Sequence, residues 1–166
     1  MSWESSLHYY RIINEQVRAR LGGLHSARSL MLSVDFDEIE KMQARGEWDR
    51  AGEVLGEAAR CLERGGPDLA VLCTNTMHKV ADVVASRMGI PLLHIADATA
   101  DAIRRAGLRR VGLLGTRFTM EEEFYRGRLS AKHGLEVLVP GGQERADVHR
   151  IIYEELCRGS VESKGI

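Results

Sequence analysis

A polar segment that offers a thiol, two hydroxyls and an amide directly follows an apolar run of the chain. The apolar run is Leu69–Leu72, the polar segment is Cys73–Thr76, and His78 comes two residues later. A thiolate near the start of a helix has a lowered pKa and can act as a base or a nucleophile. Hydroxyl, amide and free backbone N–H groups can together bind a small anion. The segment therefore suggests a site for an anionic ligand. The alternative is buried packing of Cys73 and ordinary helix capping by the threonines.

A second polar turn, Gly115–Thr119, ends the strand predicted over residues 110–116. Its glycine allows close approach, and its hydroxyl and N–H groups can bind a carboxylate or a phosphate. The turn is neither a phosphate P-loop nor a complete dinucleotide fingerprint, and a simple capped turn is the alternative. In open α/β sheets, ligands bind at the carboxyl ends of the strands, where such turns lie. His94 is expected near this edge as a hydrogen-bonded structural histidine.

Apolar periodicity predicts strands that alternate with helices along the chain. The expected strands cover residues 29–34, 69–73, 92–94, 110–116 and 135–139. The expected helices cover residues 7–21, 35–43, 51–62, 77–88, 97–106, 120–132 and 145–157. This pattern is typical of an α/β fold with a mostly parallel sheet and helices on both faces. Residues 158–166 show no periodic apolar face and are expected to be an unstructured tail.

The composition fits a globular protein and argues against several classes of function. The 166 residues carry a net charge of −1, which gives no sign of nucleic-acid or anionic-membrane binding. No apolar run is long enough to cross a bilayer, and the first residues do not resemble a secretory signal. Cys61, Cys73 and Cys157 are widely separated, which favours a reducing, cytoplasmic compartment and suggests neither a disulfide framework nor a metal site.

Together with several other segments, the two turns resemble the aspartate/glutamate racemase family of PLP-independent amino-acid racemases. The matching segments are Met1–Ser5, Gly23–His25, Ser33–Phe36, Cys73–Lys79, Leu93–Asp97, Gly112–Met120 and Ile151–Cys157. The resemblance implies one nearly complete racemase-type domain and part of a second within residues 1–157. The first half-site is expected up to about residue 95, and the second turn with a partial second lobe in residues 96–157. It also implies a cofactor-free isomerase that removes the α-proton of aspartate, glutamate or a related amino acid and returns one to the opposite face.

The resemblance assigns roles to individual residues. Alignment of Asn75 and Thr76 with the family's Cys-Asn-Thr motif puts Thr74 in the position of the catalytic base. A threonine hydroxyl is a poor proton acceptor, so His78 is expected to help it. Cys73 is the alternative, and only one of the two neighbours should face the substrate because consecutive strand residues point to opposite faces. The implied substrate-binding residues are Met1, Gln43, Thr74, Asn75, Thr76, Thr116, Arg117 and Thr119.

Departures from the family pattern predict weak or absent activity. The family's second catalytic cysteine belongs to a Gly-Cys-Thr-Glu motif, which this sequence lacks. Cys157 matches a helix position before that motif and does not replace it. Because the chain starts and stops inside the family pattern, we expect a fragment that is truncated at both ends. Uncovered apolar surface then predicts a homodimer or poor solubility.

Two functions from other classes stay open on the sequence alone. One is a non-catalytic module that binds a carboxylate through the same polar turns. The other is a hydrolase or isomerase that uses Cys73 as a covalent nucleophile. Ligand binding without α-proton exchange would distinguish the first, and ligand-protected alkylation of Cys73 the second.

Overall fold

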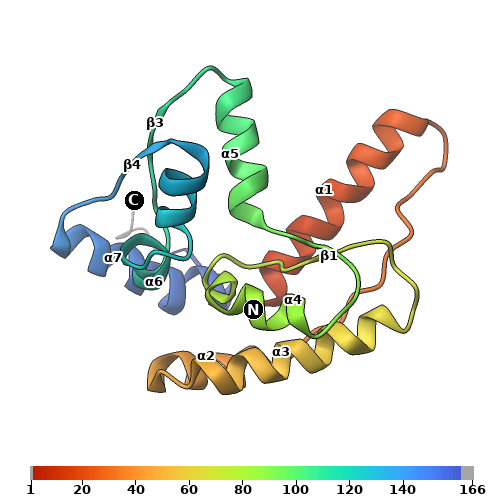
Figure 1. Cartoon of the computed structure of the whole chain (residues 1–166), viewed down its shortest axis with the longest axis horizontal. Helices are drawn as coiled ribbons and strands as arrows, with labels where there is room; N and C mark the ends of the chain where they lie inside the picture. Colours follow the sequence, from red (N-terminus) through yellow and green to blue (C-terminus); the bar gives the residue numbers. More distant parts are fainter. Residues whose placement is uncertain (1, 162–166) are drawn as a thin grey trace. The chain divides into compact units, whose positions relative to one another are not determined.

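The computed structural model describes residues 2–161 and confirms the α/β class (Figure 1). The chain divides into two compact units. The first contains the residues through Thr74 together with Val80–Leu92, and the second contains Asn75–Lys79 and the chain from Leu93 onward. We describe each unit by itself. Met1 and residues 162–166, the latter part of the expected tail, lie outside the described residues.

The first unit opens with the long helix α1 (Trp3–Leu21), which follows Ser2 and ends at Gly22 with a φ of 76°. Glu4 lies in its first turn, where a negative charge is favourable. No residue of α1 is buried, and the side chain of Trp3 is 67% exposed. An exposed apolar helix face is compatible with the expected homodimer, which stays a prediction.

The strand expected over residues 29–34 is not formed. Residues 25–35, all of which are described, connect α1 to the next helix without regular structure. A strand needs a second backbone as its hydrogen-bond partner, which an apolar sequence alone does not supply. The connection is fastened by Asn14, whose Oδ1 accepts a hydrogen bond from the Ala27 N–H at 2.9 Å. The sequence predicts a strand here because residues 29–34 are largely apolar, but several of these side chains, including Leu30 and Met31, are exposed in the structure.

Helix α2 (Phe36–Arg45) is capped by Asp35, whose carboxylate accepts from the Asp37 N–H, and ends at Gly46 in the left-handed conformation. It is followed by α3 (Trp48–Glu63), which buries Ala51, Leu55 and Ala59 along one side. Those residues recur every four positions, which is the spacing of one helix face. They form the core of the first unit together with residues from the short helix α4 (Ala81–Ser86).

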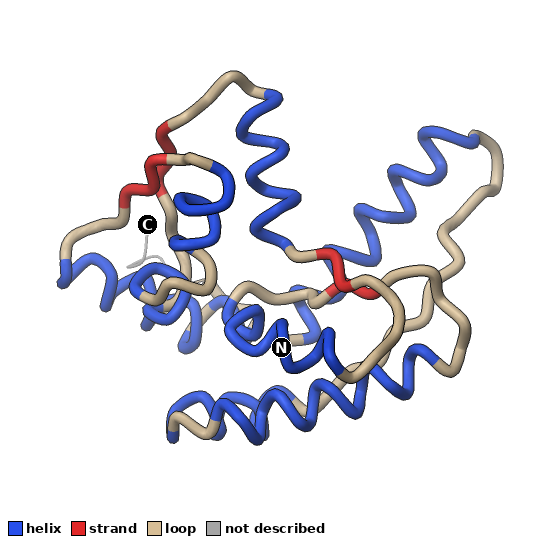
Figure 2. Tube along the Cα trace, viewed as in Figure 1, coloured by secondary structure: helices blue, strands red, loops and turns tan. Residues whose placement is uncertain are grey.

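The strands are shorter than the sequence predicts, as the red segments of Figure 2 show. β1 (Ala70–Val71) pairs with β2 (Leu92–Leu93) in one two-stranded sheet. β3 (Arg110–Gly112) and β4 (Glu136–Leu138) form a second sheet, in which they run parallel. The parallel pairing is as predicted. The strand lengths are not, because ladder hydrogen bonds extend only as far as the partner does.

The second unit includes most of the 3₁₀ turn η1 (Thr76–Val80), which precedes α4 of the first unit along the chain, so the helix predicted over 77–88 is divided. The helix predicted over 120–132 is also divided, into α6 (Arg117–Glu121) and the π-helical turn η2 (Arg128–Lys132). The remaining helical elements are α5 (Ile95–Arg105), α7 (Gly142–Glu154) and the 3₁₀ turn η3 (Leu156–Arg158). A core cluster of the second unit consists of Ala96, Ala100, Tyr125, Leu129 and Leu135.

Asp97, in the first turn of α5, fastens that helix to η2. Its carboxylate accepts two hydrogen bonds from Arg128, at 2.8 Å each, and one from Lys132 at 2.8 Å. The His133 ring contacts the same carboxylate at 2.7 Å. Hydrogen bonding to Arg128 is the main cause that holds the pKa of Asp97 far below its usual range. The carboxylate therefore stays ionised, and the start of α5 is fixed in place.

Gly52 allows α3 and α4 to approach each other. A Cβ atom at this position would lie 3.1 Å from Val83 Cγ1 and 3.4 Å from Val80 Cβ. We predict that Gly52→Leu lowers the free energy of unfolding by about 1–3 kcal/mol, because overpacking outweighs the better helix propensity of leucine. Urea denaturation measures this. Gly142→Leu is the control, since a Cβ there has no neighbour within 4 Å, and equal effects of the two substitutions would contradict the packing account.

Candidate functional site

Three buried threonine hydroxyls meet in the second unit. Thr76 Oγ1 lies 2.9 Å from Thr116 Oγ1, which lies 3.2 Å from Thr119 Oγ1. The three residues are 5%, 8% and 1% exposed, respectively. The cluster joins the two polar turns that the sequence singles out, because Thr76 begins η1 and Thr116 precedes α6. A hydroxyl in such a place must find a hydrogen-bond partner, since leaving it unpaired costs about 1–3 kcal/mol.

The hydrogen-bonding capacity of Thr116 limits which hydroxyls of the cluster can donate and which can accept. Its Oγ1 accepts from the Thr119 N–H at 3.3 Å and contacts two other hydroxyls. With one proton and two lone pairs, it donates to one hydroxyl and accepts from the other. Whichever direction is chosen, the hydroxyl proton of either Thr76 or Thr119 is not used within the cluster. The cluster can therefore offer one neutral donor to an acceptor such as a carboxylate oxygen.

The local sequence explains how the second turn forms. Thr116 has an extended conformation, with φ −63° and ψ 160°, and its hydroxyl caps α6 through the Thr119 N–H. Threonine is a favoured residue for this role. A Cβ atom on Gly115 would lie 3.1 Å from Thr119 Cβ, so glycine permits the close approach expected from the sequence. Capping and clustering thus use the same hydroxyl.

Two buried histidines attach η1 to the start of α5. His78 Nε2 accepts a hydrogen bond from the Ile95 N–H at 3.2 Å, and His94 Nδ1 accepts one from the Ala96 N–H at 3.2 Å. Their ring centroids are 4.4 Å apart at an interplanar angle of 62°. Burial, followed by repulsion from His78, lowers the pKa of His94 to about 4. His94 therefore has the hydrogen-bonded role expected of it. Because His78 accepts at Nε2, its neutral ring carries its proton on Nδ1, which counts against the role of base that the sequence suggests for His78.

Cys73 and Thr74 are the two residues of the polar segment Cys73–Thr76 that belong to the first unit. The Cys73 carbonyl accepts from Ser5 Oγ at 2.8 Å, and the Thr74 N–H donates to the Leu72 carbonyl at 2.8 Å. Burial raises the pKa of the Cys73 thiol, against a smaller opposite effect of a hydrogen bond to Ser6. A thiol with a raised pKa is protonated at neutral pH. This counts against Cys73 as a nucleophile and favours its packing interpretation.

The other predicted site residues are distributed over both units. Gln43 is buried in α2 and belongs with Thr74 to the first unit. Asn75 and Arg117 are exposed residues of the second unit. Met1 lies outside the described residues. Among the predicted residues, the structure records the contacts of the threonine cluster and a hydrogen bond from the His78 N–H to the Asn75 carbonyl at 3.0 Å.

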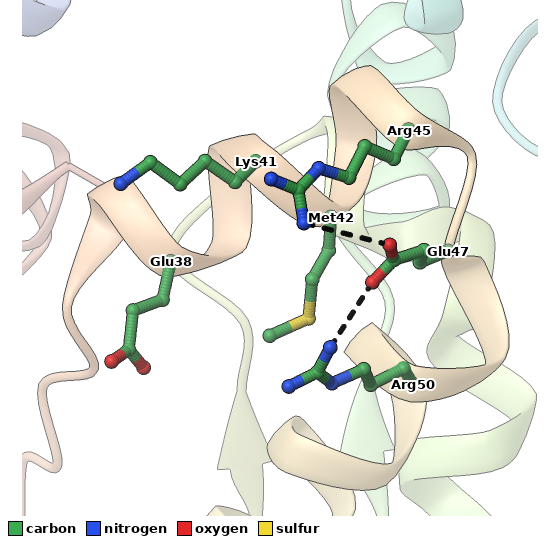
Figure 3. A pocket seen from close by; sticks show the side chains of 6 residues that line it. All are labelled: Glu38, Lys41, Met42, Arg45, Glu47 and Arg50. Atoms are coloured by element: carbon green, nitrogen blue, oxygen red, sulfur yellow. Dashed lines mark hydrogen bonds and ion pairs between the residues drawn. The ribbon is translucent and has the colours of Figure 1, made fainter.

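A charged hollow in the first unit contains none of the predicted site residues (Figure 3). It has a volume of about 200 Å³. In it, Glu47 lies between Arg45, at 3.8 Å, and Arg50, at 3.3 Å. Lys41 also has a partner, Asp37, whose hydrogen bond raises the lysine pKa. Because these charges are neutralised in pairs, the hollow is best described as a solvated surface. Its lining residues are Glu38, Lys41, Met42, Arg45, Glu47 and Arg50.

Sequence reasoning missed two residues that contact the polar turns. Glu122 forms an ion pair with Lys79 at 2.6 Å, and His149 accepts a hydrogen bond from the Arg117 N–H at 3.2 Å. Both contacts link segments that are far apart along the chain, so no local pattern predicts them. Within residues 2–161, no three His, Cys, Asp or Glu side chains are grouped closely enough to bind a metal ion. No described helix has the length and apolar character needed to cross a membrane.

The fold and the hydroxyl cluster define an α/β protein with hydrogen-bond donors at its strand-end turns. The Asp/Glu/hydantoin racemase family model matches residues 1–164. A Yersinia pestis crystal structure, described as a "putative Asp/Glu Racemase", is 55% identical over 99% of this chain and 71% of its own, with a TM-score of 0.89. An aspartate racemase homologue from Pyrococcus horikoshii is 37% identical over 97% of this chain and 70% of its own, with a TM-score of 0.79. The chain belongs to the Asp/Glu/hydantoin racemase family, which confirms the resemblance.

The lowered pKa of His94 predicts acid sensitivity. Unfolded His94 titrates near 6.5 but folded His94 near 4, so the unfolded state binds the additional proton between these values. The stability that depends on neutral His94 is complete above about pH 6.5 and is lost as the pH falls towards 4. Thermal melts from pH 7.5 to 4 should show a decrease in Tm of which about 3–5 °C is due to His94. His94→Asn keeps a capping acceptor without titrating, so an identical pH dependence in this variant would contradict the assignment.

Proposed function

We propose that this chain is an amino-acid racemase of the aspartate/glutamate type, acting on aspartate, glutamate or a related amino acid without PLP or another cofactor. The observation that supports the proposal most is the buried cluster of Thr76, Thr116 and Thr119. The hydroxyl proton that is not used within the cluster is a neutral donor for a substrate carboxylate. The Pyrococcus relative's description as an aspartate racemase homologue favours an acidic amino acid.

The difficulty of the reaction explains why such donors matter. An amino acid's α-carbon is a very weak acid, and the negative charge that develops on proton removal spreads into the carboxylate. Donors fixed around that carboxylate bind the carbanionic state more strongly than the substrate, which lowers the barrier. The residues that the proposal assigns to substrate binding are those implied by the resemblance, namely Met1, Gln43, Thr74, Asn75, Thr76, Thr116, Arg117 and Thr119.

Thr74 is the proposed proton acceptor for one face of the α-carbon. Its hydroxyl oxygen would take the α-proton while its own proton passes to water. The hydrogen bond from the Ile95 N–H counts against His78 as the acceptor of that proton, because a neutral imidazole that accepts at Nε2 carries its proton on Nδ1. The alignment of Asn75 and Thr76 with the family's Cys-Asn-Thr motif favours Thr74 over its neighbour. The raised pKa of the Cys73 thiol counts against a Cys73-dependent hydrolase or isomerase, which we therefore do not pursue.

The reaction also needs a second acid/base group, on the opposite face of the α-carbon. The resemblance associates it with a Gly-Cys-Thr-Glu motif that the sequence lacks. We therefore propose that the 166-residue chain exchanges α-protons weakly and preferentially on one enantiomer. A carboxylate-binding module without catalysis is the second candidate, and the same missing motif favours it.

Deuterium incorporation separates the two candidates. We predict that L- and D-aspartate incubated with the chain in D₂O lose their α-proton NMR signals slowly and at unequal rates. Thr74→Val should abolish exchange on the faster enantiomer, because it replaces the hydroxyl by a methyl group of similar volume. Equal, rapid exchange on both enantiomers would contradict the impaired mechanism. Calorimetric binding of aspartate without any exchange would instead support the module.

A further inference from the structure

His149 contacts the second polar turn from another helix. Its Nδ1 accepts a hydrogen bond from the Arg117 N–H at 3.2 Å, so α7 supplies an acceptor to the first residue of α6. The ring meets Phe118 edge-on, with centroids 6.0 Å apart at 81°, and lies 4.7 Å from the ring of Tyr153. These contacts on both sides fix the orientation of the imidazole.

The accepted N–H group belongs to the peptide that joins Thr116 to Arg117. The first N–H groups of a helix have no acceptor within the helix, so their orientation depends on outside partners. Thr116 Oγ1 provides one for Thr119, and His149 provides one for Arg117. These two hydrogen bonds together fix the plane of the Thr116–Arg117 peptide. They thereby also fix the orientation of the Thr116 hydroxyl towards Thr76.

We propose that His149 is a positioning residue for the carboxylate subsite. By accepting the Arg117 N–H, it keeps Thr116 and Thr119 in the arrangement that leaves a hydroxyl donor available. It does not touch the substrate. The proposal deepens the racemase assignment and rests on it only where it calls this turn the carboxylate subsite.

Acceptance by Nδ1 requires a neutral imidazole whose proton is on Nε2. Burial, followed by the charge of Arg117, lowers the pKa of His149 below its ordinary value of 6.5, against a smaller opposite effect of Glu121. Phe118 and Tyr153 are the other side chains that face the ring, and neither is charged at neutral pH. Protonation of His149 puts an N–H group on Nδ1, opposite the Arg117 N–H, and this hydrogen bond is then lost. We therefore expect the Gly115–Thr119 turn to become less ordered only at acidic pH.

Two substitutions separate the acceptor from the packing role. His149→Asn keeps an acceptor, Oδ1, at the same number of bonds from Cα as Nδ1, but does not titrate. His149→Leu keeps apolar bulk without an acceptor. Two measurements are made on the full chain: calorimetric titration with L-aspartate from pH 7.5 to 5, and ¹H–¹⁵N NMR of the Arg117 and Thr119 amides over the same range.

We expect His149→Leu to weaken aspartate binding about 5-fold at pH 7.5, the effect of losing one exposed hydrogen bond worth about 1 kcal/mol, and to shift both amide signals upfield. His149→Asn should bind within about 2-fold of the wild type and lose the acid-induced decrease in affinity. Equal losses in both variants would reduce His149 to a packing residue, and wild-type affinity in both would refute the proposal. If the wild type binds no aspartate, the proposed function fails. In that case the NMR signals of the Arg117 and Thr119 amides still test the positioning role of His149. Unchanged signals in His149→Leu would overturn that role.

Discussion

One buried hydrogen bond, between the hydroxyls of Thr76 and Thr116, is the contact on which the proposed site depends. It joins two turns that are 40 residues apart in the sequence, and it lies within the second unit. Neighbouring contacts hold each turn separately. His78 attaches η1 to the start of α5, and His149 attaches the start of α6 to α7. The hydroxyl cluster is therefore supported from two sides by imidazole acceptors bound to helix-start N–H groups.

The choice of hydroxyls over cations has a physical consequence. A neutral donor binds a carboxylate less strongly than a lysine or arginine would, but it costs far less to bury. Burial keeps the donors in place before the substrate arrives, so little reorganisation is needed as charge develops. Neutral His94 follows the same rule, since burial lowers its pKa and so disfavours a positive charge at this position. Near the cluster, the second unit thus has hydrogen-bond donors in fixed positions and few buried charges.

The sequence predicted the polar turns better than it predicted the elements around them. Capping residues and glycine act locally, so Gly115 permits a close approach and Thr116 forms a capped turn, as the sequence indicates. Strand extent depends on a partner backbone, which explains the absence of the strand expected over 29–34 and the shortness of the others. The helix predicted over 120–132 is divided, and Tyr125 and Leu129 of this segment belong to a core cluster that also contains residues of α5. His149 lay beyond sequence reasoning because its partner is 32 residues away.

The central claim is that the Thr76–Thr116 contact organises a carboxylate-binding subsite. Calorimetric titration of L-aspartate into the wild type and Thr76→Val tests it most directly, because valine preserves the shape and Thr116 can still cap α6. We predict at least about 10-fold weaker binding in Thr76→Val, and wild-type affinity in the control Thr99→Val, whose hydroxyl donates to the Ile95 carbonyl at 2.8 Å, outside the cluster. Unchanged affinity in Thr76→Val would contradict the account.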